Sequence, residues 1–126
     1  MMKTNDLEDR VINFAVSIIS IIDGVNKNYA GIYYGNQLIR SSGSPALNYG
    51  EARSAESHKD FVHKMGICLK ELRESYNCLK IIKSAHLYTG NLLDLDKILD
   101  ENNQFISIFV ASIKTSKNNN SKIVNR

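Results

Sequence analysis

The side chains that could do chemistry in this sequence are three histidines, two cysteines and a polar segment near the middle of the chain. The histidines, His58, His63 and His86, do not have the spacing of an HExxH zinc motif. The cysteines, Cys68 and Cys78, lack the CxxC spacing of a structural zinc site. The sequence also holds no phosphate-binding glycine loop and no nucleophile elbow. We therefore expect no metal, cofactor or small-molecule substrate, and we interpret His86 as a satisfied core residue.

The polar segment is RSSGSPALNYGEA, residues 40–52, which lies between apolar segments typical of helices. Pro45 removes one backbone hydrogen bond, so we expect a kinked helix at that point. Small side chains around it let a neighbouring backbone come close. Asn and Glu without a nearby nucleophile or metal-ligand pattern make a poor catalytic set, so we favour a structural polar joint over an active site. The members of this polar joint are Arg40, Ser44, Asn48 and Glu51.

A second candidate site is a row of basic side chains in the helix expected over residues 58–87. At 100° per residue, five positions fall on one stripe, which we name the basic edge: Lys59, His63, Lys70, Arg73 and Lys80. An acidic stripe adjoins it: Glu56, Asp60, Glu71 and Glu74. Three interpretations stay open. The edge could be a solvated face with pairs such as Asp60–Lys64 and Lys70–Glu74, a packing edge between subunits, or a surface that follows phosphates.

Four helices must position these residues. The spacing of apolar residues predicts helices over residues 5–25, 32–53, 58–87 and 92–115. The predicted core positions of the third helix are Phe61, Met65, Cys68, Leu72, Tyr76, Leu79, Ile82 and His86. We expect an all-α domain over residues 1–115, an antiparallel up-down-up-down four-helix bundle. The first helix is apolar on more than one side, which indicates burial against another subunit.

The charge of the chain is concentrated at its end. The net charge is +3, but residues 1–113 carry 12 basic and 13 acidic side chains. The remaining basic residues are Lys114, Lys117, Lys122 and Arg126, and we expect a basic disordered tail over residues 116–126. The overall basicity is therefore no argument for nucleic-acid binding by the body of the protein. The N-terminus has no signal-peptide layout and the longest apolar segment is too short for a membrane, so we expect a cytoplasmic protein.

Two segments carry a resemblance to a known family. They are QLIRSSGSPALNYGEARSAES and KDFVHKMGICLKELRESYNCLKII, within a likeness that extends over residues 7–115. The chain resembles the four helix bundle protein family, also called the 23S rRNA intervening sequence proteins. The most specific positions are Arg40–Ser41, Asn48–Glu51, Asp60–Phe61 and Lys70–Glu71–Glu74. Asn77 and Cys78 stand where relatives usually have a tryptophan.

The resemblance implies a compact bundle, a homopentameric ring and a bacterial source. A related protein, the accessory variability determinant of diversity-generating retroelements, forms a basic pentameric barrel that engages nucleic acid and a reverse transcriptase. Ordinary members have no established biochemical activity. We therefore expect a non-enzymatic oligomeric bundle, with itself and RNA or DNA as partners. The alternative is a pure protein–protein interaction module whose charged helix edges only build the homo-oligomer.

Overall fold

The computed structural model describes residues 6–124, and side chains through residue 119. Four α-helices and one short 3-10 helix follow one another: α1 (Asp6–Ile21), η1 (Ile22–Gly24), α2 (Tyr29–Arg53), α3 (His58–Ser84) and α4 (Leu92–Val124). The expected all-α class and the four helices are confirmed, and the described part contains no strand longer than a single bridge, between Val25 and Tyr88. No helix in that part has the length and apolar character needed to cross a membrane.

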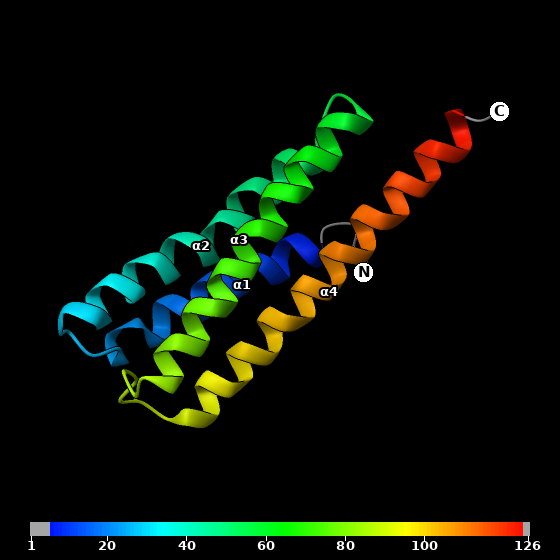
Figure 1. The fold of residues 1–126 in the computed structure, drawn as a ribbon. Helices are drawn as coiled ribbons and strands as arrows, with labels where there is room; N and C mark the ends of the chain where they lie inside the picture. Colours follow the sequence, from blue (N-terminus) through cyan, green and yellow to red (C-terminus); the bar gives the residue numbers. More distant parts are fainter. Residues whose placement is uncertain (1–5, 125–126) are drawn as a thin grey trace.

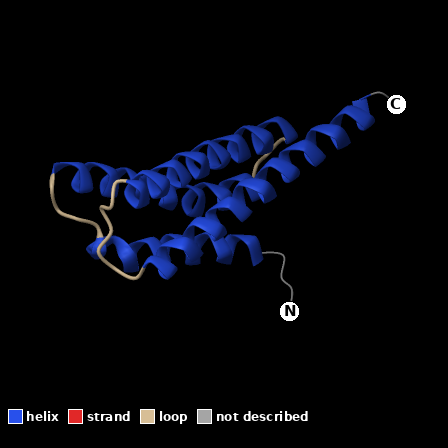
Figure 2. Ribbon diagram, turned by 60° about the horizontal axis from the view of Figure 1, so that its bottom comes forward, coloured by secondary structure: helices blue, strands red, loops and turns tan. Residues whose placement is uncertain are grey.

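Consecutive helices run in opposite directions along one bundle (Figure 1). Ion pairs connect the start of one helix to the end of its neighbour, as expected for antiparallel helices. Glu8, near the start of α1, binds Arg53 at the end of α2 at 2.6 Å. In the same way Lys83 at the end of α3 binds Asp96 at the start of α4 at 2.6 Å. The loops gather at the two ends of the bundle, and the last turns of α4 project beyond the other helices (Figure 2).

The core lies between the inward faces of all four helices. Five of the predicted core positions of α3 are buried: Met65, Cys68, Leu72, Leu79 and Ile82. Phe14 of α1 and Phe105 of α4 pack edge to face with their ring centres 5.5 Å apart. The inward face of α2 includes the small residues Ser41 and Ser42, so α2 can lie close to its neighbours. α2 is one continuous helix that includes Pro45. The kink at Pro45 stays a prediction.

Four helix boundaries differ from those expected: the ends of α1, α3 and α4 and the start of α2. α1 ends at Ile21 rather than residue 25, because the chain continues as η1 from Ile22. α2 begins at Tyr29 rather than residue 32 because the Asn28 side chain accepts a hydrogen bond from the Gly31 amide, which caps the helix. α4 continues to Val124 through the segment expected to be a disordered tail, since no glycine or proline after residue 115 interrupts it. The last two residues of that tail, 125 and 126, lie outside the described residues.

The end of α3 overturns the prediction that His86 is a core residue. α3 ends at Ser84, and His86 is exposed in a left-handed conformation with φ 56°. The His86 amide donates to the Lys83 carbonyl at 3.1 Å, and the Leu87 amide donates to the Ile82 carbonyl at 3.0 Å. These two bonds define a Schellman motif, in which His86 takes the place usually held by glycine. Leu87 is buried in its stead.

Candidate nucleic-acid interface

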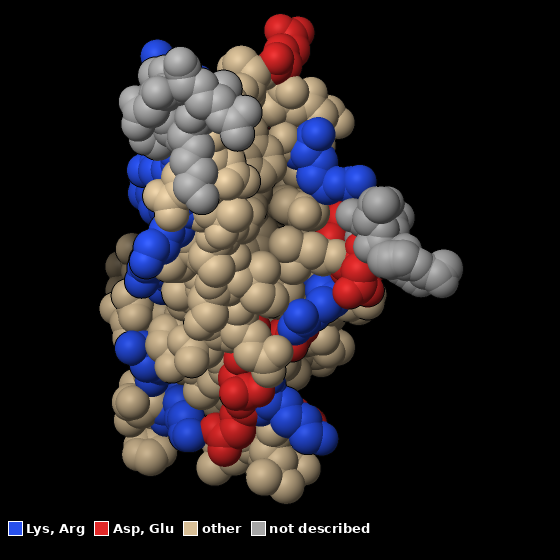
Figure 3. Space-filling model, turned by 90° about the vertical axis from the view of Figure 1, so that its right-hand side faces the viewer, with Lys and Arg blue, Asp and Glu red and all other residues tan. Residues whose placement is uncertain are grey.

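The basic edge of α3 is open to solvent along its whole length. Its five members are all exposed: Lys59, His63, Lys70, Arg73 and Lys80. They share one side of the helix because the buried positions of α3 occupy the opposite side. Figure 3 shows a column of Lys and Arg side chains along one side of the molecule, beside a largely uncharged strip.

Two acidic residues beside the basic edge, Glu71 and Glu74, bind Arg40 of α2 rather than the lysines of their own helix. The expected Asp60–Lys64 and Lys70–Glu74 pairs give way to pairs between helices. Lys64 binds Glu51 of α2 with 2.7 Å between Nζ and Oε1. Glu74 binds Arg40 of α2. An ion pair within one helix contributes only about 0.3 kcal/mol to stability. An oppositely charged side chain on a neighbouring helix can therefore replace it.

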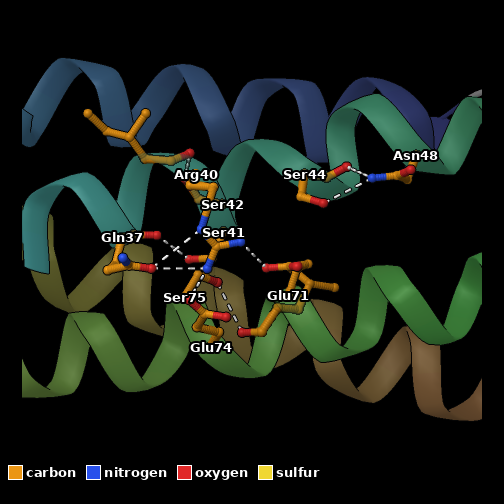
Figure 4. Close-up of polar contacts among 11 residues, drawn as sticks. Gln37, Arg40, Ser41, Ser42, Ser44, Asn48, Glu71, Glu74 and Ser75 are labelled. Atoms are coloured by element: carbon orange, nitrogen blue, oxygen red, sulfur yellow. Dashed lines mark hydrogen bonds and ion pairs between the residues drawn. The ribbon is translucent and has the colours of Figure 1, made fainter.

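Arg40 holds two carboxylates of α3 at once. Its guanidinium donates to Glu74 and, at 2.9 Å, to Oε1 of Glu71. Figure 4 shows Arg40 reaching from α2 toward both carboxylates, with Gln37 accepting further bonds from it. The hydrogen bond to Glu74, followed by the bond to Glu71, raises the pKa of Arg40 above its ordinary value. Two of the carboxylates nearest the basic edge are thus paired within the molecule.

The predicted polar joint does not form one cluster. Arg40 contacts α3 as described, and Glu51 binds Lys64. Ser44 and Asn48 contact each other within α2, where Asn48 Nδ2 donates to the Ser44 carbonyl and hydroxyl oxygens at 2.9 Å each (Figure 4). Asn48 therefore binds the carbonyl of Ser44 and not that of Ser41, which Pro45 leaves without its usual donor. The four residues form three separate contacts along α2.

Two polar features escaped sequence reasoning. Ser75 and Asn102 are fully buried between α3 and α4, with 2.7 Å between the Ser75 hydroxyl and Asn102 Oδ1. Asn102 falls in the helical spacing of the buried residues Leu95, Ile98 and Phe105, and this spacing could have revealed it. Arg10 of α1 lies 4.9 Å from the centre of the Phe105 ring, which no pattern within α1 indicates.

The two cysteines and the three histidines are not gathered into a reactive site. Cys68 and Cys78 are free thiols in the core. Burial raises the pKa of the Cys68 thiol to about 11 and raises that of Cys78 as well, so neither is activated as a nucleophile. Among the described residues, no three His, Cys, Asp or Glu side chains are grouped so as to hold a metal ion.

Comparison with known proteins agrees with this architecture. The pattern of the 23S rRNA-intervening sequence protein family matches residues 3–108. A crystal structure of a protein of unknown function from the S23 ribosomal protein family of Bacteroides thetaiotaomicron is similar, with a TM-score of 0.73 and 25% identity. The likeness covers 85% of this chain and 97% of that one. A comparison with curated proteins finds no match.

The fold and its surface define a four-helix bundle protein with a basic edge along α3. The chain belongs to the 23S rRNA-intervening sequence protein family, which confirms the resemblance given by the two segments quoted above. The match ends at residue 108, so the last part of α4 lies beyond the region that defines the family.

Proposed function

We propose that this chain is a non-enzymatic, oligomeric four-helix bundle that associates with RNA or DNA through the basic edge of α3. The observation that carries the proposal is the pairing of Arg40 with Glu71 and Glu74. Those carboxylates adjoin the basic edge and would repel phosphate if they were unpaired. Their neutralisation leaves the exposed Lys and Arg side chains to set the local charge, and phosphate recognition depends mainly on such side chains.

The geometry of the basic edge suits contacts with the nucleic-acid backbone. Lys59 and Lys80 are 21 positions apart on one helix, so the edge extends roughly 30 Å at 1.5 Å per residue. No aromatic residue interleaves with the basic positions, and Tyr76, which lies near them, is covered by Lys80 with 4.7 Å from Nζ to the ring centre. We therefore expect binding that depends on salt and is tolerant of sequence.

The assembly we propose is a homopentamer in the bacterial cytoplasm. The pentamer rests on the family resemblance, and three exposed aliphatic side chains of α1 support burial against another subunit: Ile12, Val16 and Ile19. The protein of known structure that resembles the chain comes from a bacterium. A ring would repeat the basic edge on each subunit, and linked copies bind one strand more tightly than a single copy does.

The test is filter binding with a 20-nucleotide RNA and a single-stranded DNA of the same length over a range of salt concentrations. The full-length protein should retain both at low salt, with retention falling as salt rises. The double variant Lys70→Glu with Arg73→Glu should lose this retention. The matched control, Lys27→Glu with Lys97→Glu, has the same net charge, changes two exposed lysines away from α3 and should keep most of it. Absence of salt-dependent retention by the unmodified protein would remove the nucleic-acid function.

A second candidate function is a pure protein–protein interaction module, which the exposed aliphatic side chains of α1 favour. In this case the charged edges of α3 only join subunits, and nucleic acid is not a partner. Light scattering of a Lys59→Glu, Lys70→Glu variant, which changes two exposed members of the basic edge, separates the two functions. Loss of the oligomer supports the interaction module, whereas an intact oligomer that no longer retains RNA supports the basic edge as a nucleic-acid surface.

A further inference from the structure

The outer side of the α1–α2 pair carries exposed aliphatic side chains in two helical rows. We name them the aliphatic ridge: Ile12, Val16, Ile19, Ile32, Ile39 and Leu47. Their exposed fractions run from 42% for Ile12 to 77% for Leu47. The spacing within each row, 4 and 3 positions in α1 and 7 and 8 in α2, keeps the row on one side of its helix. Contiguous apolar surface of this kind marks an interaction site.

The two rows belong to one face of the molecule. α1 and α2 are neighbours, joined by the Glu8–Arg53 ion pair, and Ile22 of η1, directly after α1, comes close to Gly35 of α2. The buried side of α1 includes Val11 and Ile18, and that of α2 includes Leu38 and Pro45. In each helix the ridge residues lie opposite these buried positions, so both rows face outward together.

The opposite side of the bundle carries a complementary surface on α3 and α4. We name its apolar members the α3–α4 strip: Val62, Leu69, Tyr76, Leu99, Ile106 and Val110. Val110 is 39% exposed, and the other five side chains are half-buried. On α3 they lie on the flank away from Glu71, whose carboxylate faces α2. Figure 3 shows this side of the molecule as a largely uncharged strip with Lys and Arg side chains along one border.

The charges beside the two surfaces indicate what each one binds. The exposed carboxylate of Asp9 lies on the same side of α1 as the ridge, and the exposed Asp23 follows in η1 just beyond the end of α1. They would repel phosphate and the anionic surface of a membrane, so the ridge suits a protein partner. Arg73 and Lys80 border the strip and offer the opposite charge. One chain thus presents an apolar surface with carboxylates beside it and, on its far side, an apolar surface with Lys and Arg side chains along one border.

We infer that the aliphatic ridge of one copy packs on the α3–α4 strip of a second copy. This inference rests on the oligomer of the proposed function and identifies the two surfaces that build it. Two different surfaces on opposite sides of one subunit make a heterologous contact, and such contacts close into rings when the rotation allows. Most of the basic edge, from Lys59 to Lys70, lies outside the contact and stays available to nucleic acid.

The test is the mass of purified full-length variants by light scattering. Val16→Asp with Ile19→Asp should convert the oligomer to monomer, and so should Val110→Asp on the strip. Leu93→Asp is the matched control, because Leu93 is 67% exposed in the first turn of α4, outside both surfaces, where a carboxylate is tolerated. Circular dichroism melting checks folding, and the milder Val16→Ser with Ile19→Ser replaces the first variant if it unfolds.

Mixing the two monomeric variants tests the pairing of ridge with strip. The ridge variant keeps an intact strip and the strip variant keeps an intact ridge, so an equimolar mixture should give a dimer and nothing larger. An oligomer that survives either substitution, or a mixture that stays monomeric, would overturn this inference and leave the proposed oligomer standing. A monomeric unmodified protein would overturn both, while the nucleic-acid function would still be decided by filter binding.

Discussion

Ser75 of α3 and Asn102 of α4 form a hydrogen-bonded pair in the interior of the bundle, 2.7 Å from hydroxyl to Oδ1. Asn102 Nδ2 also donates to the Leu72 carbonyl at 2.9 Å. Both side chains are fully buried, so a shift of α4 along α3 would leave these polar groups without partners. Such a pair costs stability when it is broken, and it fixes the position of one helix against the other.

Replacing Asn102 with Ala should destabilise the fold strongly. The substitution removes one of the two acceptors of the Ser75 hydroxyl and the side-chain donor to the Leu72 carbonyl, and it leaves a small cavity. We therefore expect the free energy of unfolding to fall by about 2–3 kcal/mol. Urea denaturation measures this change. The double variant Ser75→Ala with Asn102→Leu replaces both polar groups by apolar ones, and should recover most of the loss. A double variant less stable than Asn102→Ala would contradict a role for the pair itself.

Arg40→Gln should weaken RNA retention without unfolding the protein. The substitution frees Glu71 and Glu74 beside the basic edge, and their negative charges then repel phosphate. The triple variant Arg40→Gln, Glu71→Gln, Glu74→Gln should restore retention, measured by filter binding at several salt concentrations. Failure of the rescue would show that Arg40 contacts nucleic acid directly instead of neutralising its neighbours.

Cys68 should make the fold more sensitive to alkali. Burial raises the pKa of its thiol from 9.0 to about 11, so the folded chain keeps the thiol proton over a range in which the unfolded chain loses it. The stabilisation is present in full below pH 9 and is lost as the pH rises through 11. Urea denaturation from pH 8 to pH 11 should therefore show a steeper loss for the unmodified protein than for Cys68→Ala. Equal slopes would contradict this assignment.

Two glycines should respond in opposite ways to alanine. A methyl group at Gly31 would collide with the backbone carbonyl of Asn26, which cannot move without breaking the loop before α2. We expect Gly31→Ala to cost several kcal/mol, above about 2. Gly66 has open space around it within α3, so Gly66→Ala should stabilise the helix by about 0.5–1 kcal/mol. Thermal melting of both variants checks the difference, and equal effects would contradict it.

The parts of the fold predicted from sequence are those set by local pattern. α3 begins at His58, where the predicted helix over residues 58–87 begins, and Ser57 caps it by accepting a hydrogen bond from the Asp60 amide. Buried residues along α3 recur at the predicted spacing, since one helix face must meet the core. The family resemblance could be read from the same segments because it depends on residue identity alone.

The parts that could not be predicted depend on neighbours in space. The partners of Arg40 come from another helix, and their choice depends on how far α2 is offset along α3. His86 matches the apolar spacing of α3, but the Schellman motif ends the helix before that position. Ser44, Asn48 and Glu51 lie within one polar segment of the sequence. In the structure Asn48 binds Ser44, whereas Glu51 binds Lys64 of α3, so the three residues do not form one site.

The length of α4 has a consequence for the exchange of backbone amide hydrogens with solvent. His58 at the start of α3 lies 3.5 Å from Ser116 of α4, so the eight residues that follow, 117–124, extend past the bundle by roughly 12 Å at 1.5 Å per residue. The described side chains of this segment, Lys117, Asn118 and Asn119, are exposed, and a helix end with exposed side chains opens easily. Its amides should therefore take up deuterium far faster than those around Phe105, and any slowing on assembly or on addition of RNA would reveal a partner that covers them.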